Sequence, residues 1–157
     1  MATEIEKKFL VSSDAWRTEN PLAVPMRQGY LAGSAKSSIR VRIAGDQANL
    51  NIKSATLGIR RLEFEYEIPL EEAQEMLDML AEGPLVEKTR YHVRVDGHLW
   101  EVDVFEGDNA GLVVAEIELT AEDEEFTRPP WLGREVSGDA RYYNVSLCKH
   151  PYKDWRD

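Results

Sequence analysis

The chain opens with a short run of charged residues whose spacing suits a β-strand. Glu4, Glu6 and Lys8 stand at alternate positions. Because alternate residues of a strand share one face, two carboxylates and one ammonium group would stand in a row on one side. Such a row is either a solvated strand surface or the lining of a site for cations and anions.

Later segments repeat this alternation, and their charged residues are sorted by sign. Like charges that face each other across neighbouring strands are destabilising, so a solvated surface has no reason to collect them in this way. The basic segments carry Arg40, Arg42, Lys53, Lys88 and Arg90, the acidic segments carry Glu101, Asp103, Glu116 and Glu118, and a mixed segment carries Arg61, Glu63 and Glu65.

Collecting like charges becomes favourable when the basic side chains bind an anion and the acidic side chains bind cations. Mg²⁺ and Mn²⁺ take carboxylate oxygens and keep substrate phosphates in their coordination shell. Guanidinium groups match phosphate oxygens two at a time, and lysine adds a compact positive charge. One cavity lined by both sets would therefore bind an anion together with its metal ions.

Strands must position these residues, because most of the chain alternates polar and apolar side chains. An Asp96-Gly97 pair between two such segments is a strong hairpin signal. A capped short helix is expected near 12–16, a clearer one over 69–80 and a terminal one over 139–147. The alternating segments predict about eight strands near 3–11, 26–33, 38–44, 48–54, 60–68, 85–95, 98–105 and 112–120.

Length and composition narrow the class of protein. A chain of 157 residues suits one domain, here 1–157, and a net charge of −10 argues against a nucleic-acid partner. Cys148 is the only cysteine, so no disulfide framework forms within the chain. No segment is apolar enough for a signal region or a membrane span, so we expect a cytoplasmic protein with no membrane partner.

Short turns between many antiparallel strands indicate a barrel or a sandwich. A mainly β (α+β) barrel would place the charged faces inside, around a water-filled channel. Its apolar faces would then point outward, where helices such as 70–80 would cover them. The outward set is Ile39, Val41, Ile43, Leu50, Ile52, Leu62, Phe64, Tyr66, Trp100, Val102, Ile117 and Leu119.

The same residues resemble a known family. Glu4 to Lys8 match the ExExK signature of the CYTH superfamily, the triphosphate tunnel metalloenzymes. This signature is weak alone, but the likeness continues in order along nearly the whole chain, through 28–31, 39–42, 52–53, 61–68, 88–91, 101–103, 116–119 and 131–136.

The resemblance implies an eight-stranded antiparallel barrel that forms a charged tunnel, with a few flanking helices and a C-terminal helix near one mouth. It also implies a triphosphate substrate and Mg²⁺ or Mn²⁺, two per site. By position, the substrate-binding residues would be Lys8, Arg40, Arg42, Lys53, Arg61, Lys88 and Arg90, the metal ligands Glu4, Glu6, Glu63, Glu65, Asp103, Glu116 and Glu118, and the candidate bases Glu4, Glu6 and Asp103.

Among family members, the small bacterial inorganic triphosphatases are the most similar. We therefore expect hydrolysis of tripolyphosphate to pyrophosphate and phosphate by a monomer or homodimer. The alternatives are a nucleoside or thiamine triphosphatase, a class IV-type adenylate cyclase, and a non-catalytic polyphosphate-binding module. A barrel that carries an apolar ligand would need the opposite orientation of the strand faces.

Overall fold

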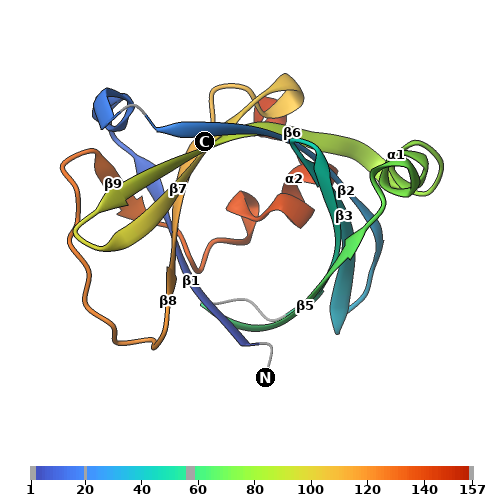
Figure 1. Cartoon of the computed structure of the whole chain (residues 1–157), viewed down its shortest axis with the longest axis horizontal. Helices are drawn as coiled ribbons and strands as arrows, with labels where there is room; N and C mark the ends of the chain where they lie inside the picture. The colour runs from blue at the N-terminus through green and yellow to red at the C-terminus, as the bar shows by residue number, and fades with distance from the viewer. Residues whose placement is uncertain (1–2, 20, 56–58, 156–157) are drawn as a thin grey trace.

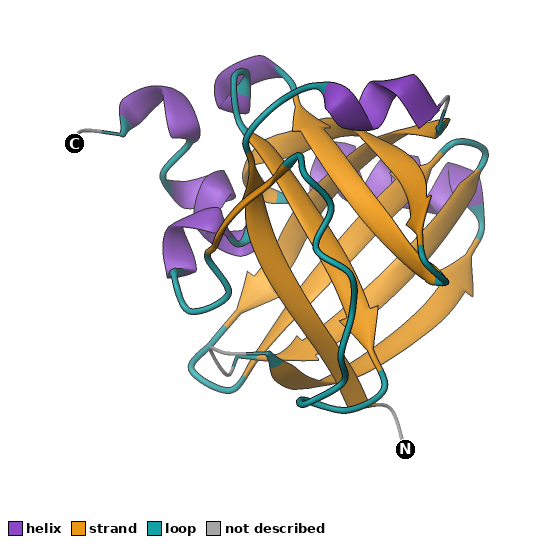
Figure 2. Cartoon of the chain, turned by 90° about the vertical axis from the view of Figure 1, so that its left-hand side faces the viewer, coloured by secondary structure: helices purple, strands orange, loops and turns teal. Residues whose placement is uncertain are grey.

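The fold is a closed β-barrel with short helices on its outside and at one end (Figures 1 and 2). The computed structural model describes residues 3–19, 21–55 and 59–155. Its strands are β1 (Thr3–Val11), β2 (Leu22–Gly33), β3 (Ser37–Ala44), β4 (Gln47–Ser54), β5 (Arg60–Ile68), β6 (Glu82–Val95), β7 (His98–Phe105), β8 (Val113–Leu119) and β9 (Leu132–Glu135).

Antiparallel pairing closes the barrel through its first and fifth strands. The sheet order is β5-β4-β3-β2-β6-β7-β8-β1, and β1 also pairs with β5, with Glu4 opposite Arg61. The expected eight-stranded barrel is therefore confirmed. β9 is an additional short strand that pairs with β1 around Phe9, which the sequence pattern did not predict.

The helices differ from expectation at the two ends of the chain. Helix α1 (Leu70–Met79) is confirmed. The helix expected near 12–16 is instead a 3₁₀ turn over Ala15–Glu19. The terminal helix expected over 139–147 is split, because the backbone of Tyr143 is extended between a 3₁₀ turn (Ala140–Tyr142) and α2 (Asn144–Lys149).

The largest apolar cluster lies outside the barrel wall, as the orientation of the strand faces predicts. Phe9 and Trp100 point outward from β1 and β7, and both are fully buried. The segment between β8 and β9 runs along this side of the barrel (Figure 2) and brings Phe126 and Trp131 against them. The largest apolar core therefore lies between the outside of the barrel and the segment that covers it, and not inside the barrel.

Two smaller clusters cover other parts of the wall. Helix α1 packs Ala73 and Leu77 on Val41 and Ile43 of β3. Helix α2 packs Leu147 in a cluster with residues of β6, β7 and β8.

Strand β5 departs from the expected cover. Its outward side chains remain exposed, at 46% for Leu62, 43% for Phe64 and 56% for Tyr66. The expectation that helices cover the whole apolar outside is therefore wrong for this strand, because α1 packs mainly on β2, β3 and β4.

No helix among the described residues combines the length and apolar character that a membrane crossing requires.

Two phenylalanines on the outward face of the wall provide a matched test of the external core. Phe9 is fully buried, whereas Phe64 is 43% exposed. We expect Phe9→Ala to lower the free energy of unfolding by about 3–5 kcal/mol, because it leaves a cavity in a packed cluster. Phe64→Ala should cost less than about 1 kcal/mol. Urea denaturation measures both, and equal losses would contradict an external core that covers β1 and spares β5.

Candidate active site

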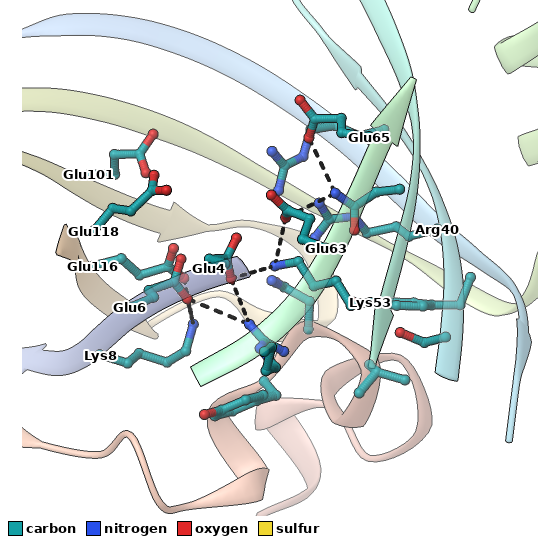
Figure 3. A pocket seen from close by; sticks show the side chains of 18 of the residues that line it. Glu4, Glu6, Lys8, Arg40, Lys53, Glu63, Glu65, Glu101, Glu116 and Glu118 are labelled. Carbon is teal, nitrogen blue, oxygen red and sulfur yellow. Dashed lines mark hydrogen bonds and ion pairs between the residues drawn. The ribbon is translucent and has the colours of Figure 1, made fainter. Parts of the chain in front are cut away.

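The barrel encloses a cavity of about 250 Å³ whose wall is mostly charged. Figure 3 shows labelled side chains from β1, β3, β4, β5, β7 and β8 pointing into this common space. The cavity is lined by Glu4, Glu6, Lys8, Tyr30, Ser38, Arg40, Arg42, Asn51, Lys53, Arg61, Glu63, Glu65, Arg90, Glu101, Glu116, Glu118, Tyr143, Asn144 and Val145.

The period-two alternation of the strands explains this convergence. On β1, Glu4, Glu6 and Lys8 line the cavity, while Ile5 and Phe9 belong to the outer cluster. All of the site residues expected from the sequence line the cavity except Lys88 and Asp103. These two side chains are also on the inner face but are buried at 0% and 1% exposure.

Carboxylates crowd one side of the cavity, on β7, β8 and β1. The strand register places Glu6 opposite Glu118 and Glu101 opposite Glu116. Burial raises the pKa of Glu6, and the negative charge of Glu116 raises it further. Burial also raises the pKa of Glu118, aided by the charges of Glu63 and Glu101. These acids repel one another, and a cation would relieve the repulsion.

The pKa of Glu4 is also raised. Burial, together with the neighbouring charge of Glu6, raises its pKa to about 7. Although burial acts in the opposite direction, hydrogen bonds with Glu4 and Asn51 lower the pKa of Glu63 to about 2. Of these two carboxyl groups, Glu4 is therefore the one that takes up a proton first as the pH falls.

Lysines and one arginine hold the carboxylates in place. Lys53 Nζ lies 3.2 Å from Glu4 Oε1 and 3.3 Å from Glu63 Oε2. Arg61 Nη2 lies 3.3 Å from the same Glu4 oxygen. These ion pairs join β1, β4 and β5, the strands at which the barrel closes.

Lys8 pairs with the acids of the neighbouring strand. Its ammonium group donates a short hydrogen bond to Glu116. Burial acts against the charged forms of both, but their mutual attraction raises the pKa of Lys8 and holds that of Glu116 well below its usual range, with Arg90 also lowering the latter.

Two guanidinium groups on β3, buried Arg40 and partly buried Arg42, lack such carboxylate partners. The structure gives neither Arg40 nor Arg42 an ion pair with any described carboxylate, and the buried Nε of Arg40 has no hydrogen-bond partner there. Arg42 Nε donates to the amide oxygen of Gln28. Burial, then the positive charges of Arg40 and Arg90, lower the pKa of Arg42 to about 9. An anion bound here would remove this cost.

One end of the cavity is bounded by the segment around α2, which crosses the barrel opening in Figure 1. The ring of Tyr143 lies against Lys8 and Arg61, with distances of 5.2 and 5.1 Å from each cation to the ring centre. Its hydroxyl donates to the carbonyl of Ser137 at 2.6 Å. This residue was missed from the sequence, because it follows no strand alternation.

The donor set suits a hard divalent cation, although the ligand geometry is not preformed. Oxygen atoms of carboxylates are the ligands that Mg²⁺ and Mn²⁺ prefer. Within the described ranges, no three acidic, histidine or cysteine side chains stand close enough to form a metal site by themselves. Phosphate oxygens would have to supply the remaining ligands.

Comparison with known proteins gives the same picture. A CYTH domain matches residues 2–151. Over 157 residues, all of both chains, the protein is 50% identical to an inorganic triphosphatase of Acetivibrio thermocellus. It is 42% identical over 150 residues to an inorganic triphosphatase of Nitrosomonas europaea, covering 93% of this chain and 97% of that one.

A solved structure agrees at the level of the fold and the sequence. The crystal structure of an inorganic triphosphatase superposes with a TM-score of 0.67 at 38% identity, covering 94% of this chain and 95% of that one. The charged cavity, the ordered strand motifs and these matches lead to one conclusion: the chain belongs to the CYTH domain family.

Proposed function

We propose that the protein hydrolyses inorganic triphosphate to pyrophosphate and phosphate inside the barrel cavity. The observation that carries this proposal is that one cavity holds both basic groups without acidic partners and acidic groups that repel one another. Arg40 is buried and Arg42 is partly buried, neither has an ion pair with a described carboxylate, and both share one cavity with carboxylates that repel one another. A polyanion with bound divalent cations satisfies both sides, and the curated relatives are inorganic triphosphatases.

The size of the cavity supports a small inorganic substrate. Pockets for drug-sized ligands usually have volumes of about 300–1,000 Å³. The cavity here is about 250 Å³, and Tyr143, Asn144 and Val145 bound one end. A triphosphate alone suits this space better than a triphosphate that carries a nucleoside or thiamine group.

The basic residues would bind and orient the phosphate chain. Phosphoryl transfer depends mainly on positioning and on neutralising charge, and both need cations around the reacting phosphate. Arg40 and Arg42 offer forked donors from β3, opposite the acids of β7 and β8. Lys8, Lys53, Arg61 and Arg90 also line the wall and would stabilise the charge that collects on the pyrophosphate leaving group.

The acidic residues would hold Mg²⁺ or Mn²⁺, and we propose two ions per site. When bound, the metal would supply charge neutralisation on the phosphates and a more acidic water molecule. The metal ligands that we propose are Glu4, Glu6, Glu63, Glu65, Glu116 and Glu118. Lys88 and Asp103 are in neither group, since neither lines the cavity.

Glu4 is suited to accept the proton of the attacking water, and Glu6 is the neighbouring candidate. A general base works best when its pKa lies near the working pH. The pKa of Glu4 is raised to about 7 by burial and by Glu6. As the oxygen of water bonds to the terminal phosphorus, the bridging P–O bond breaks, pyrophosphate leaves, and the water proton passes to the carboxylate.

We further propose that residues 1–157 form a single domain and that the protein acts in the cytoplasm, as a monomer or homodimer, with neither nucleic acid nor membrane as a partner. The net charge of −10 supports the exclusion of nucleic acid. Light scattering after size-exclusion chromatography distinguishes the two oligomeric states, and cell fractionation tests the location.

Substitution of the cavity carboxylates tests the active site. We expect Glu4→Gln, Glu6→Gln and Glu118→Gln each to retain less than about 1% of tripolyphosphate hydrolysis, because loss of one charge-stabilising group costs on the order of 10²–10³ in rate. Glu75→Gln on the exposed face of α1 is the matched control and should keep full activity. Full activity in any of the three cavity variants would refute that residue's assignment.

A substrate panel tests the preference for inorganic triphosphate. Phosphate release is measured in parallel from tripolyphosphate, ATP and thiamine triphosphate, with Mg²⁺, with Mn²⁺ and without metal. We expect release from tripolyphosphate to dominate and to require a metal. Dominant release from ATP would contradict the substrate assignment, and no release from any would indicate a binding module.

The pKa of Glu4 predicts a pH dependence for cation binding. Below about pH 7, Glu4 is protonated in the metal-free protein and must lose its proton before it binds a cation. We therefore expect Mn²⁺ binding to release a proton at pH 6 and almost none at pH 9, and the apparent affinity to fall by up to about tenfold per pH unit below 7. Titration calorimetry in two buffers of different ionisation enthalpy measures the proton count.

The raised pKa of Glu4 also makes the stability of the metal-free protein depend on pH. Because the folded state binds the proton of Glu4 more tightly than the unfolded state, the metal-free fold should lose stability as the pH rises from about 4.5 to 7. Proton uptake on metal binding at pH 6, or a metal-free fold that gains stability over this range, would argue against a protonated Glu4.

A further inference from the structure

Asp103 and Lys88 form a buried pair directly behind the cavity wall. Their side chains are 1% and 0% exposed, and neither lines the cavity. Asp103 lies on β7 and Lys88 on β6, at neighbouring positions of the barrel. A fully buried ion pair is costly to desolvate, so its retention in this place calls for a role.

Arg90 links this pair to the cavity. Its Nε donates to Asp103 Oδ1 at 2.7 Å, and its Nη2 donates to Oδ2 at 2.9 Å, in a forked arrangement. Lys88 Nζ donates to the same Oδ2 at 2.6 Å. Both carboxylate oxygens of Asp103 are therefore engaged by cations, in three charge-assisted hydrogen bonds.

The remaining contacts of Arg90 face the acids of the wall. Its Nη1 lies 3.3 Å from Glu101, and its Nη2 lies 3.4 Å from Glu116. These bonds are long compared with those to Asp103, so the buried carboxylate holds the guanidinium more firmly than the wall acids do. Without Asp103, Arg90 would lose its two shortest hydrogen bonds, and its guanidinium group would no longer be held in one orientation toward the cavity.

We propose that Asp103 is a positioning residue that holds Arg90 against the back of the cavity wall, with Lys88 as the second cation of the buried trio, and that Asp103 binds neither metal nor substrate. Of these three residues, Arg90 alone lines the cavity. This proposal rests on the proposed function for the role of Arg90, and it replaces the sequence expectation of Asp103 as ligand and base and of Lys88 as a substrate-binding residue.

Direct metal binding separates a positioning residue from a ligand. Calorimetry or Mn²⁺ electron paramagnetic resonance measures Mn²⁺ affinity for the substrate-free parent, Asp103→Asn and Glu118→Gln. We expect Asp103→Asn to bind Mn²⁺ within about twofold of the parent, and Glu118→Gln to bind at least about tenfold more weakly. A tenfold loss in Asp103→Asn would overturn the proposal, whether or not the protein hydrolyses tripolyphosphate.

A double-mutant cycle tests the link to Arg90. Asp103→Asn alone should lower kcat/KM for tripolyphosphate by about 10–100-fold, the usual effect of losing a supporting partner. When Arg90 is already Lys, the same change should cost less than about threefold, because the forked partner is gone. Equal losses in the two backgrounds would overturn the proposal.

Urea denaturation of each variant is the control that shows whether it is folded. If Asp103→Asn alone unfolds, the double variant Asp103→Asn with Lys88→Met removes both buried charges and takes its place, since an uncompensated buried charge is the main source of the damage. The double variant should keep the Mn²⁺ affinity of the parent, and loss of that affinity in a folded double variant would again overturn the proposal. A parent protein that fails to hydrolyse tripolyphosphate refutes the proposed function alone, since the metal-binding arm does not depend on turnover.

Discussion

The attraction and repulsion between charges enclosed in one small barrel cavity govern the rest of this structure. Two unit charges 4 Å apart interact by about 4 kcal/mol at an effective dielectric constant near 20. The cavity wall holds many such pairs, among them Lys53 with Glu4 and Lys8 with Glu6. Since the barrel interior is filled by these groups, the apolar faces must point outward and find cover there. The external core around Phe9 and Trp100 is the direct result.

Charged side chains are more completely paired in some parts of the cavity than in others, and these parts have different roles. The trio of Asp103, Lys88 and Arg90 is fully paired and forms a fixed back wall. Glu4 forms ion pairs with Lys53 and Arg61, but its pKa is raised to about 7, close to neutral pH. Arg40 and Arg42 on β3 have no ion pair with a described carboxylate, and the crowded acids of β7, β8 and β1 repel one another in spite of their ion pairs. A metal-bound polyanion placed between them would complete the pairing.

The period-two pattern was sufficient to predict the eight strands of the barrel and most of the site residues, whereas the family resemblance favoured a barrel over a sandwich. Parity alone places Arg40, Glu63 and Glu116 on the inner face, because a strand must alternate. Parity also placed Asp103 and Lys88 there, but it does not report how deeply a side chain is buried or which neighbour captures it. Tyr143 escaped prediction because it lies in an extended break before α2, where no periodicity applies. The exposure of the outer face of β5 was not predicted, because this strand has the same alternation of polar and apolar residues as the covered strands.

A crystal structure of the protein with Mn²⁺ and tripolyphosphate, using a cavity variant that binds without turnover, tests the central claim most directly. The account predicts Mn²⁺ anomalous density inside the barrel beside Glu6, Glu116 and Glu118, with phosphate oxygens in contact with Arg40 and Arg42. Density for the metal and the phosphate chain outside the barrel, with the cavity filled only by water and internal ion pairs, would contradict it.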